Sequence, residues 1–252
     1  MPRQARQTSK FGLYHVMLRG IDRTQLFYDD DDRIAFMERL VRYKEECEFS
    51  LLAWCLMANH VHLLIKENAV SLSVIMKKLE LSYSNYFNAK YDRRGYLFED
   101  RYKSEPIESD KYLLAVVRYI HRNPLEIGEQ MAHWTSYDEY LTSPDIADTT
   151  LILGILDPTM KRPHLAFKEF VDIPQDTTYS FIGDKSPKHI KDLEAMKMIL
   201  AESGLGSCTD LFSLEKEARN KVIASLRKKG LSIRQIARLT GINRGIVEAA
   251  KP

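Results

Sequence analysis

Two apolar segments separated by two residues constrain the fold of this chain more than any other feature. FSLLAWCLM, residues 49–57, is a continuous apolar run of strand length, and VHLLI, residues 61–65, continues as a second strand beyond Ala58-Asn59. Short apolar runs on either side of a turn are typical of neighbouring strands in the core of a sheet. We therefore expect a buried β-hairpin.

Two histidines, His60 and His62, lie one residue apart at the start of the second strand. Side chains alternate between the two faces of a strand, so both imidazoles point the same way and Val61 points the other way. Two imidazoles on one face can share a divalent cation. In an arbitrary protein such a pair is more often two ordinary, partly buried histidines, so the metal interpretation needs a third ligand.

Strands and helices are expected to alternate over the first half of the chain. The ranges are a strand at 11–20, a helix at 28–49, the hairpin at 49–65, a helix from 71 or 73 to about 88, a strand near 104–107 and a helix at 109–122. Asp29 to Asp32 lie at the start of the first helix, where negative charge complements the helix dipole, so we interpret them as helix-start residues rather than a metal site. This order predicts an α+β fold, an antiparallel sheet with helices packed on it.

The expected helix at 109–122 offers the missing ligand. Tyr119 and Asn123 are four residues apart and lie on one helix face. An asparagine carbonyl oxygen suits Mg²⁺ or Mn²⁺, and with two imidazoles it leaves open positions for phosphate oxygens and water. A tyrosine beside that ion is a potential nucleophile if a nearby positive charge or base helps its phenol to lose its proton. Taken alone, Tyr119 is one of thirteen tyrosines and would be interpreted as a packing residue.

Three linked motifs carry a resemblance to a known family. They are MANHVHLLI (57–65), GYLFEDRYKS (95–104) and RYIHRNP (118–124), the last followed by WTSYDEY (134–140). In this order they resemble the HUH-type single-tyrosine transposases, specifically the REP-associated tyrosine transposases, over roughly residues 8–142. Ala58 stands where that family often has proline, in a turn that does not touch the chemistry.

The resemblance implies a ferredoxin-like α+β fold and a metal-dependent enzyme that cuts and rejoins single-stranded or hairpin DNA. His60 and His62 match the histidine pair of the HUH motif. Tyr119 matches the catalytic tyrosine, and Asn123 matches the polar residue that helps to hold Mg²⁺ or Mn²⁺. The implied products are a 5′-phosphotyrosine enzyme and a free 3′-hydroxyl, which can later attack the covalent bond and rejoin strands.

Binding of single-stranded DNA requires basic side chains for the backbone and aromatic rings for unstacked bases. The segment 93–103 has both, and two more arginines flank the tyrosine. The candidate DNA-binding residues are Arg93, Arg94, Arg101, Lys103, Arg118 and Arg122. Arg3, Arg6 and Lys10 form a basic N-terminal arm that is a further candidate for gripping a DNA hairpin.

The C-terminal segment is strongly basic. Residues 211–252 contain ten Lys or Arg and three Glu, a local net charge of +7 in a chain whose total is +2. The sequence SIRQIARLTGINRGIVEAA fits a helix-turn-helix, with small Ala237 at the helix crossing and Gly241 at the turn. Asn243 and Arg244 would begin the recognition helix, so this module is expected to bind the major groove of double-stranded DNA.

These observations predict three parts. They are a tyrosine transposase domain at 1–142, a connector with short helices at 143–186, and an all-α helix-turn-helix domain at 187–252. The chain shows neither a membrane-spanning stretch nor the apolar segment of a signal peptide, so we expect a soluble, cytoplasmic protein. Three widely spaced cysteines fit free thiols rather than structural zinc. The sequence does not decide between a monomer and a homodimer.

Two other classes of function fit part of the pattern. A DNA-binding regulator would use the helix-turn-helix as its active part and keep a domesticated, non-mobilising catalytic domain. The four intact residues of the expected site, His60, His62, Tyr119 and Asn123, favour the enzyme, because a relic would not need all of them. A zinc hydrolase or deaminase fits poorly, because there is no Cys-x-x-Cys pair and no glutamate placed beside the histidines.

Overall fold

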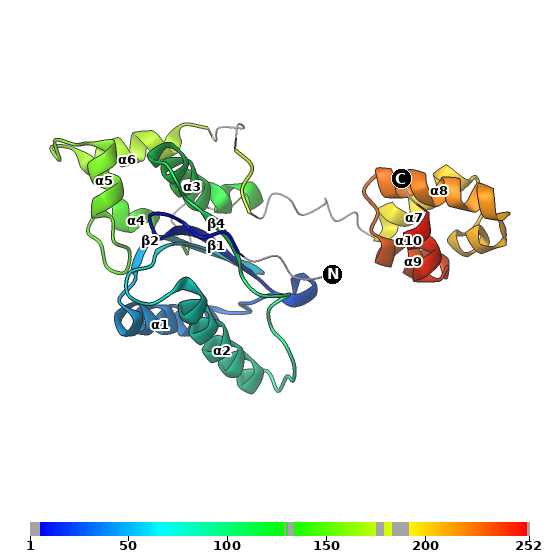
Figure 1. Ribbon diagram of the computed structural model, residues 1–252, viewed down its shortest axis with the longest axis horizontal. Helices are drawn as coiled ribbons and strands as arrows, with labels where there is room; N and C mark the ends of the chain where they lie inside the picture. Colours follow the sequence, from blue (N-terminus) through cyan, green and yellow to red (C-terminus); the bar gives the residue numbers. More distant parts are fainter. Residues whose placement is uncertain (1–5, 129, 131–133, 175–178, 183–191, 251–252) are drawn as a thin grey trace. The chain divides into compact units, whose positions relative to one another are not determined.

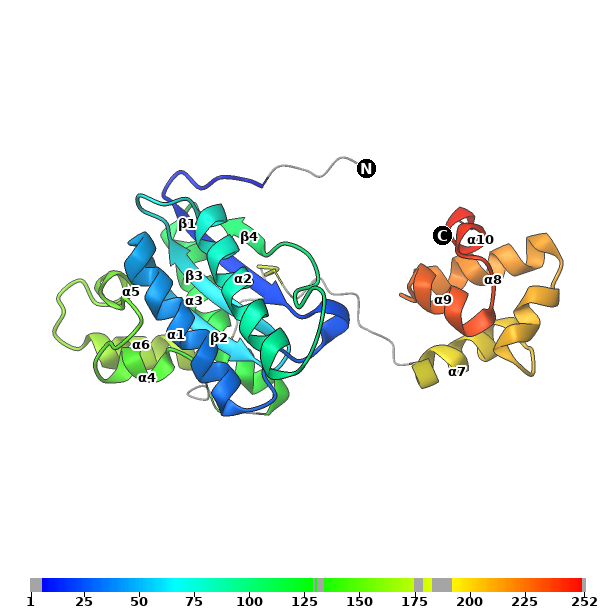
Figure 2. The same cartoon turned by 90° about the horizontal axis from the view of Figure 1, so that it is seen from below.

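The computed structural model describes residues 6–128, 130, 134–174, 179–182 and 192–250. The chain divides into two compact units, Met1–Asp184 and Lys185–Pro252. In the first unit a sheet lies between two layers of helices, and the second unit consists of helices (Figures 1 and 2). None of the helices in the described ranges combines the length and the apolar composition that crossing a membrane requires.

A four-stranded antiparallel sheet forms the centre of the first unit, with the strand order β2-β3-β1-β4. The strands are β1 (Leu13–Arg19), β2 (Ser50–Met57), β3 (His60–Lys66) and β4 (Lys103–Pro106). The expected hairpin is formed by β2 and β3, which Ala58 and Asn59 connect. The Ala58 carbonyl accepts a hydrogen bond of 2.7 Å from the Leu26 N–H, which holds the turn against the segment that precedes the first long helix.

One face of the sheet is covered by α1 (Asp30–Cys47) and α2 (Leu72–Lys90), which pack on each other (Figure 1). Val16 of β1 and Leu63 of β3 are fully buried against this layer. The helix α1 begins at the aspartates, where the Asp29 carboxylate accepts the Asp32 N–H at 2.9 Å. This bond satisfies a donor that the first turn would otherwise leave unpaired, so Asp29 is a helix cap.

The other face is covered by α3 (Asp110–Arg122), with α4 (Tyr137–Leu141), α5 (Thr150–Leu156) and α6 (Pro163–Asp172) beside it. The Ser109 hydroxyl accepts the Tyr112 N–H and caps α3. Phe167 of α6 is fully buried in the core that α3 forms with the sheet. Segment 143–186, expected to be a connector with short helices, therefore contributes two helices to the core of the first unit.

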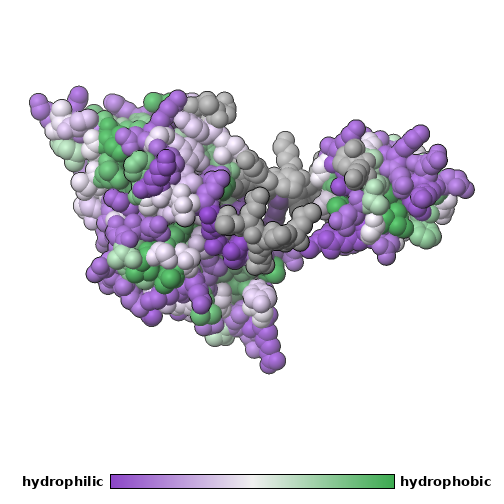
Figure 3. Space-filling view, viewed as in Figure 1, coloured by the Kyte–Doolittle hydropathy of each residue, from purple (hydrophilic) through white to green (hydrophobic). Residues whose placement is uncertain are grey.

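The second unit has a core of its own. Its elements are α7 (Asp192–Ser203), a 3₁₀ helix η3 (Cys208–Ser213), α8 (Lys216–Lys228), α9 (Ile233–Thr240) and α10 (Arg244–Ala249). Gly241 ends α9 with φ 73°, in the left-handed region that glycine adopts without steric cost. Ile223, Ile236 and Val247 are buried together, so α8, α9 and α10 share one core. Hydrophilic side chains cover most of the visible face of this unit (Figure 3).

Candidate active site

The predicted histidine pair and the predicted nucleophile meet between the sheet and α3. β1 lies beside β3, with Arg19 opposite His60, and the alternation of β3 directs His60 and His62 toward α3. The ring centroids of His60 and His62 are 5.0 Å apart. The ring of Tyr119, on α3, has its centroid 5.3 Å from that of His62. Residues from two distant parts of the sequence therefore share one site.

Asn123 completes the predicted set. It follows α3 directly, one turn after Tyr119, and its side chain is hydrogen-bonded to His60. Asn123 is 4% exposed and Tyr119 is 7% exposed, so the site is well covered. The apolar stripe of α3 packs on the sheet, which places both side chains against the histidines.

His15 is a member of this cluster that the sequence interpretation missed. Its Nε2 atom is 3.0 Å from Nδ1 of His62, and both side chains are fully buried. The ring of His15 is also 5.8 Å from the ring of Tyr119. Alternation within the first strand places His15 and Arg19 on one face, but only the pairing of β1 with β3 brings that face to the histidine pair.

The site keeps its histidines neutral. Burial lowers the pKa of His60 to about 4, with a further lowering by the charge of Arg19 and an opposing effect of the bond to Asn123. Burial also lowers the pKa of His15 to about 3, and it holds the pKa of His62 well below its ordinary value. Neutral imidazole is the form that coordinates a metal ion, so these side chains are ready to act as ligands at neutral pH.

The residues present fit a divalent cation. His62 Nε2 is buried without a hydrogen-bond partner, and so is the Nδ2 atom of Asn123. A buried imidazole nitrogen without a partner is costly unless something occupies its lone pair, and a metal ion would do so at His62 Nε2. The Asn123 Nδ2 atom is a donor, so Asn123 would hold the ion through its Oδ1 atom. The set combines two imidazoles with an amide rather than acidic groups. In the described part of the chain, no cluster of three or more His, Cys, Asp or Glu side chains is arranged to hold a metal.

Arg19 places a positive charge near Tyr119. Burial lowers its pKa, and Glu99 and Tyr119 act in the opposite direction. The guanidinium of Arg19 is thus near enough to interact electrostatically with the phenol oxygen of Tyr119. The sequence interpretation did not single out Arg19, although its place at the end of the first strand was visible.

Phe181 covers one side of the Tyr119 ring. Its ring is stacked on that of Tyr119 and also lies near the rings of Tyr112 and His15. Phe181 belongs to residues 179–182, which follow α6. No feature of the sequence indicated that this segment reaches the site, because it falls in the expected connector.

Comparison with known proteins identifies the part of the chain that carries this site. Residues 9–123 match the family described as "Transposase IS200 like". This part of the chain is similar to the IS200-like transposases. The matched range includes the histidine pair, Tyr119 and Asn123, and it identifies the domain as one from a family of DNA-processing enzymes.

Two solved structures resemble the chain, each at low identity. One is a REP-associated tyrosine transposase bound to a REP hairpin, with 16% identity, a TM-score of 0.48, and coverage of 55% of this chain and 84% of that one. The other, described as a candidate transposase from Deinococcus radiodurans R1, has 17% identity, a TM-score of 0.35, and coverage of 48% and 97%. Among curated proteins, none matches the chain.

The expected DNA-binding residues of the transposase domain fall into two groups. Lys103 pairs with Met17 at the edge of the sheet, on the face that carries the histidines, and its side chain is exposed. Arg94 and Arg101 are exposed in the loop before β4, while Arg93 is partly buried with its guanidinium 5.5 Å from the ring centroid of Phe87. These four residues therefore lie along one loop and its following strand.

Arg118 and Arg122 have other contacts. Arg118 donates to the Phe170 carbonyl (3.0 Å) and Arg122 donates to the Val171 carbonyl (3.0 Å), so both guanidinium groups are directed to α6. They lie on the face of α3 that packs against α6 rather than on the face of Tyr119. Both arginines are close to Tyr119 in the sequence, but helix periodicity turns their side chains to a different side of α3.

The residues expected to read double-stranded DNA lie at the start of α10. Asn243 and Arg244 are both exposed. The Asn243 side chain accepts the Gly245 N–H at 2.8 Å and caps this helix. Asn243 thus has a structural role in the free chain, whereas Arg244 extends from the first position of α10.

Proposed function

We propose that this chain is a metal-dependent endonuclease and strand transferase that acts on single-stranded or hairpin DNA. The observation that carries the proposal is the position of Tyr119 beside His62, with Asn123 bonded to His60, inside an IS200-like transposase domain. His60, His62 and Asn123 are neighbours, His62 Nε2 is buried without a hydrogen-bond partner, and Tyr119 lies beside His62.

His60, His62 and Asn123 would hold Mg²⁺ or Mn²⁺. Donation from His62 Nδ1–H to His15 Nε2 would fix the tautomer that leaves the lone pair on His62 Nε2. When bound, the ion supplies Lewis-acid polarisation of the scissile phosphate and positions it. His15 would thus act as a positioning residue for His62.

Tyr119 would carry the covalent step. Its phenol oxygen attacks the phosphorus atom, a Tyr–O–P bond forms, and the bond between phosphorus and the 3′ oxygen breaks. The phenol proton ends on the departing 3′ oxygen, so the products are a 5′-phosphotyrosine and a free 3′-hydroxyl. Arg19 favours the loss of that proton because its positive charge stabilises the phenolate. Attack by a 3′-hydroxyl on the same linkage rejoins strands without an external energy source.

The rest of the chain would serve DNA recognition. The strand order β2-β3-β1-β4, with α1 and α2 on one face, supports a ferredoxin-like fold for the catalytic part. The helix pair α9 and α10, joined at Gly241, supports a helix-turn-helix that binds double-stranded DNA through Asn243 and Arg244. We place a catalytic part at residues 1–142, a structured connector at 143–186 and a DNA-binding part at 187–252, in a cytoplasmic monomer or homodimer.

A second candidate function has its own supporting observation. The last 42 residues carry a net charge of +7, and their helices expose Arg244 at the start of α10. Such a module supports a DNA-binding regulator in which the transposase domain binds hairpins without cutting them. The two functions differ in whether a covalent protein–DNA product forms.

The deciding experiment incubates the full chain and Mg²⁺ or Mn²⁺ with labelled single-stranded hairpin DNA from the flanks of its own gene. Denaturing gels detect a covalent adduct. Tyr119→Phe should abolish the adduct, whereas Tyr112→Phe, which removes a phenol two turns earlier on α3, should retain it. Binding without an adduct for every hairpin and both ions would favour the regulator.

A further inference from the structure

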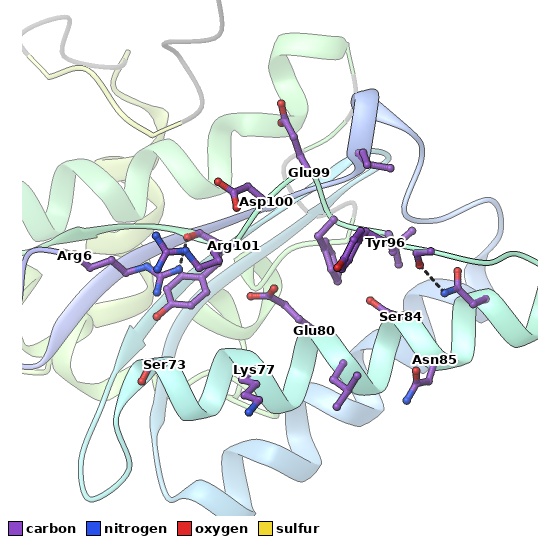
Figure 4. A pocket seen from close by; sticks show the side chains of 17 residues that line it. Arg6, Ser73, Lys77, Glu80, Ser84, Asn85, Tyr96, Glu99, Asp100 and Arg101 are labelled. Atoms are coloured by element: carbon purple, nitrogen blue, oxygen red, sulfur yellow. Dashed lines mark hydrogen bonds between the residues drawn. The ribbon is translucent and has the colours of Figure 1, made fainter. Parts of the chain in front are cut away.

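A cavity on the opposite face of the sheet from the histidines lies between α2 and the loop that leads to β4. Its volume is about 810 Å³, within the range of about 300–1,000 Å³ typical of small-ligand sites. Figure 4 shows side chains of α2, the loop and the N-terminal segment around it. The polar residues on its wall include Arg6, Ser73, Lys77, Glu80, Asn85 and Arg101.

Hydrogen bonds fix the wall of this cavity. Asn88 on α2 donates to the Gly95 carbonyl at 3.0 Å and fastens the start of the loop to the helix. At the other end, Arg6 donates to the Tyr102 carbonyl at 3.0 Å, and its guanidinium lies 3.6 Å from the centroid of the Tyr102 ring. The loop is therefore held at both ends, so the cavity is a formed site.

Glu80 is the carboxylate that α2 directs into the cavity (Figure 4). Burial raises the pKa of Glu80 to about 7, while the Tyr102 N–H and the charge of Arg6 act in the opposite direction. The carboxylate accepts a hydrogen bond from the Tyr102 N–H and keeps further acceptor capacity, because two carboxylate oxygens offer about four positions. A ligand with two adjacent donors would match it.

The loop beside this cavity also contacts the catalytic cluster. The Glu99 N–H donates to the Arg19 carbonyl at 2.9 Å, and Phe98 forms a bridge with Gly20. Arg19 is the strand partner of His60. The loop therefore connects the wall of the cavity with the strand that carries Arg19, next to the catalytic cluster.

We infer that this cavity binds one unpaired guanine of the DNA strand, with the Glu80 carboxylate accepting from its N1–H and its 2-amino group. Guanine is the natural base that presents two adjacent donors on its Watson–Crick edge, so a bidentate contact with a carboxylate selects it. Adenine, cytosine and thymine each place an acceptor beside their donor. The inference rests on the proposed function, because it assumes that the domain handles single-stranded DNA.

Other residues of the cavity wall can contact the phosphate groups and the face of the base. Arg6, Lys77 and Arg101 line the cavity and can contact phosphate oxygens, although Glu99 and Asp100 also line it and balance part of their charge. Tyr96 also lines it and is 86% exposed, so its ring is free for stacking on a base. An exposed ring of this size costs free energy in water, which a stacked base would recover.

The test measures binding of the full chain to fluorescent nonamers of thymidine whose central position is guanine, hypoxanthine, adenine or cytosine. EDTA and pH 8 are used, so that no cleavage occurs and Glu80 is ionised. The guanine nonamer should bind about five- to a hundredfold more tightly than the hypoxanthine nonamer, which lacks only the 2-amino group. Equal binding of these two nonamers would overturn the inference.

Variants of the chain then test which residues produce the preference for guanine. Glu80→Gln should bind the guanine and hypoxanthine nonamers equally, whereas Glu38→Gln, an exposed change of the same charge on α1, should keep the preference. Tyr96→Ala should weaken all four complexes because it removes the stacking ring. A guanine preference that persists in folded Glu80→Gln would overturn the assignment of Glu80.

The outcome is independent of the covalent chemistry. All measurements are repeated in Tyr119→Phe, whose base preference should be unchanged. If no adduct forms with hairpin DNA but the guanine preference is present, the proposed cleavage is wrong and the base site stands. If the adduct forms and the preference is absent, the cleavage stands and the base site is wrong.

Discussion

The ring of Phe181 lies nearly flat against the ring of Tyr119, with their centroids 4.4 Å apart and their planes at 15°. Phe181 is 1% exposed, so it is held as firmly as a core residue although it belongs to the segment after α6. One side of the proposed nucleophile is thus occupied by the chain itself. A DNA strand that approaches Tyr119 from this side must displace the Phe181 ring.

Replacing Phe181 by alanine should therefore accelerate covalent adduct formation in a single-turnover assay. The same change should lower the free energy of unfolding by about 3–5 kcal/mol, as is usual for a buried phenylalanine, so the assay is run well below the melting temperature. Phe212→Ala, which removes a ring that is 60% exposed, should alter neither quantity. An unchanged or slower rate in folded Phe181→Ala would show that the ring does not obstruct the substrate.

Replacing His15 by alanine should weaken the affinity for Mn²⁺ by about 10- to 100-fold, the usual effect of losing a residue that orients a metal ligand. The physical reason is that His62 Nδ1 would lose its partner at 3.0 Å, so the ring and its tautomer would no longer be fixed. Calorimetric titration with Mn²⁺ measures the affinity directly, without a DNA substrate.

The matched control for His15 is His164→Ala. His164 contacts the Tyr140 carbonyl on the α4–α6 side of the first unit and takes no part in the site. Its loss should leave Mn²⁺ binding unchanged. Equal affinities of His15→Ala and the unchanged chain would contradict the positioning role of His15.

The sequence predicted those parts of the site that depend on local periodicity. The hairpin, the common face of His60 and His62, and the helix that carries Tyr119 all follow from alternation or helical spacing within a few residues. The mixed fold with an antiparallel sheet was also predicted and is present. In these cases the relevant neighbours are close in the chain.

The residues that the sequence did not indicate depend on contacts between distant segments. His15 meets His62 only because β1 pairs with β3 in one register, and a shift of one residue would turn His15 to the other face. Phe181 reaches Tyr119 from a segment 62 positions later, where proline spacing suggested only a connector. Neither contact has a local signal.

The stability of the chain should depend on pH through Glu80. Its pKa in the folded chain is about 7, raised by burial from an ordinary value of 4.5. Between these two values the folded state holds a proton that the unfolded state has released, so the free energy of unfolding falls as the pH rises through this interval. Glu80→Gln cannot titrate, and its free energy of unfolding should fall less over the same interval.

Urea unfolding at several pH values between 4.5 and 8 measures this difference, with Glu38→Gln as the control for removal of one exposed carboxylate. The curve for Glu38→Gln should run parallel to that of the unchanged chain. Parallel curves for Glu80→Gln and the unchanged chain would mean that Glu80 titrates alike in both states, and the raised pKa would then be wrong.

Replacing glycine by alanine should have opposite effects on stability at two positions, Gly241 and Gly154. Gly241 has φ 73°, and an added Cβ would meet no atom within 4 Å, so alanine there acts through backbone strain alone. We expect Gly241→Ala to destabilise the C-terminal unit by about 1–2 kcal/mol, the cost of the left-handed conformation for a residue with a side chain.

Gly154 lies within α5 with similar open space, and Gly154→Ala should stabilise the first unit by about 0.5–1 kcal/mol because alanine favours helix. Thermal unfolding followed by circular dichroism measures both changes, and binding of duplex DNA should weaken only in Gly241→Ala, because the turn at Gly241 sets the direction of α10. A stabilised Gly241→Ala variant would contradict the geometry of this turn and the proposed helix-turn-helix that depends on it.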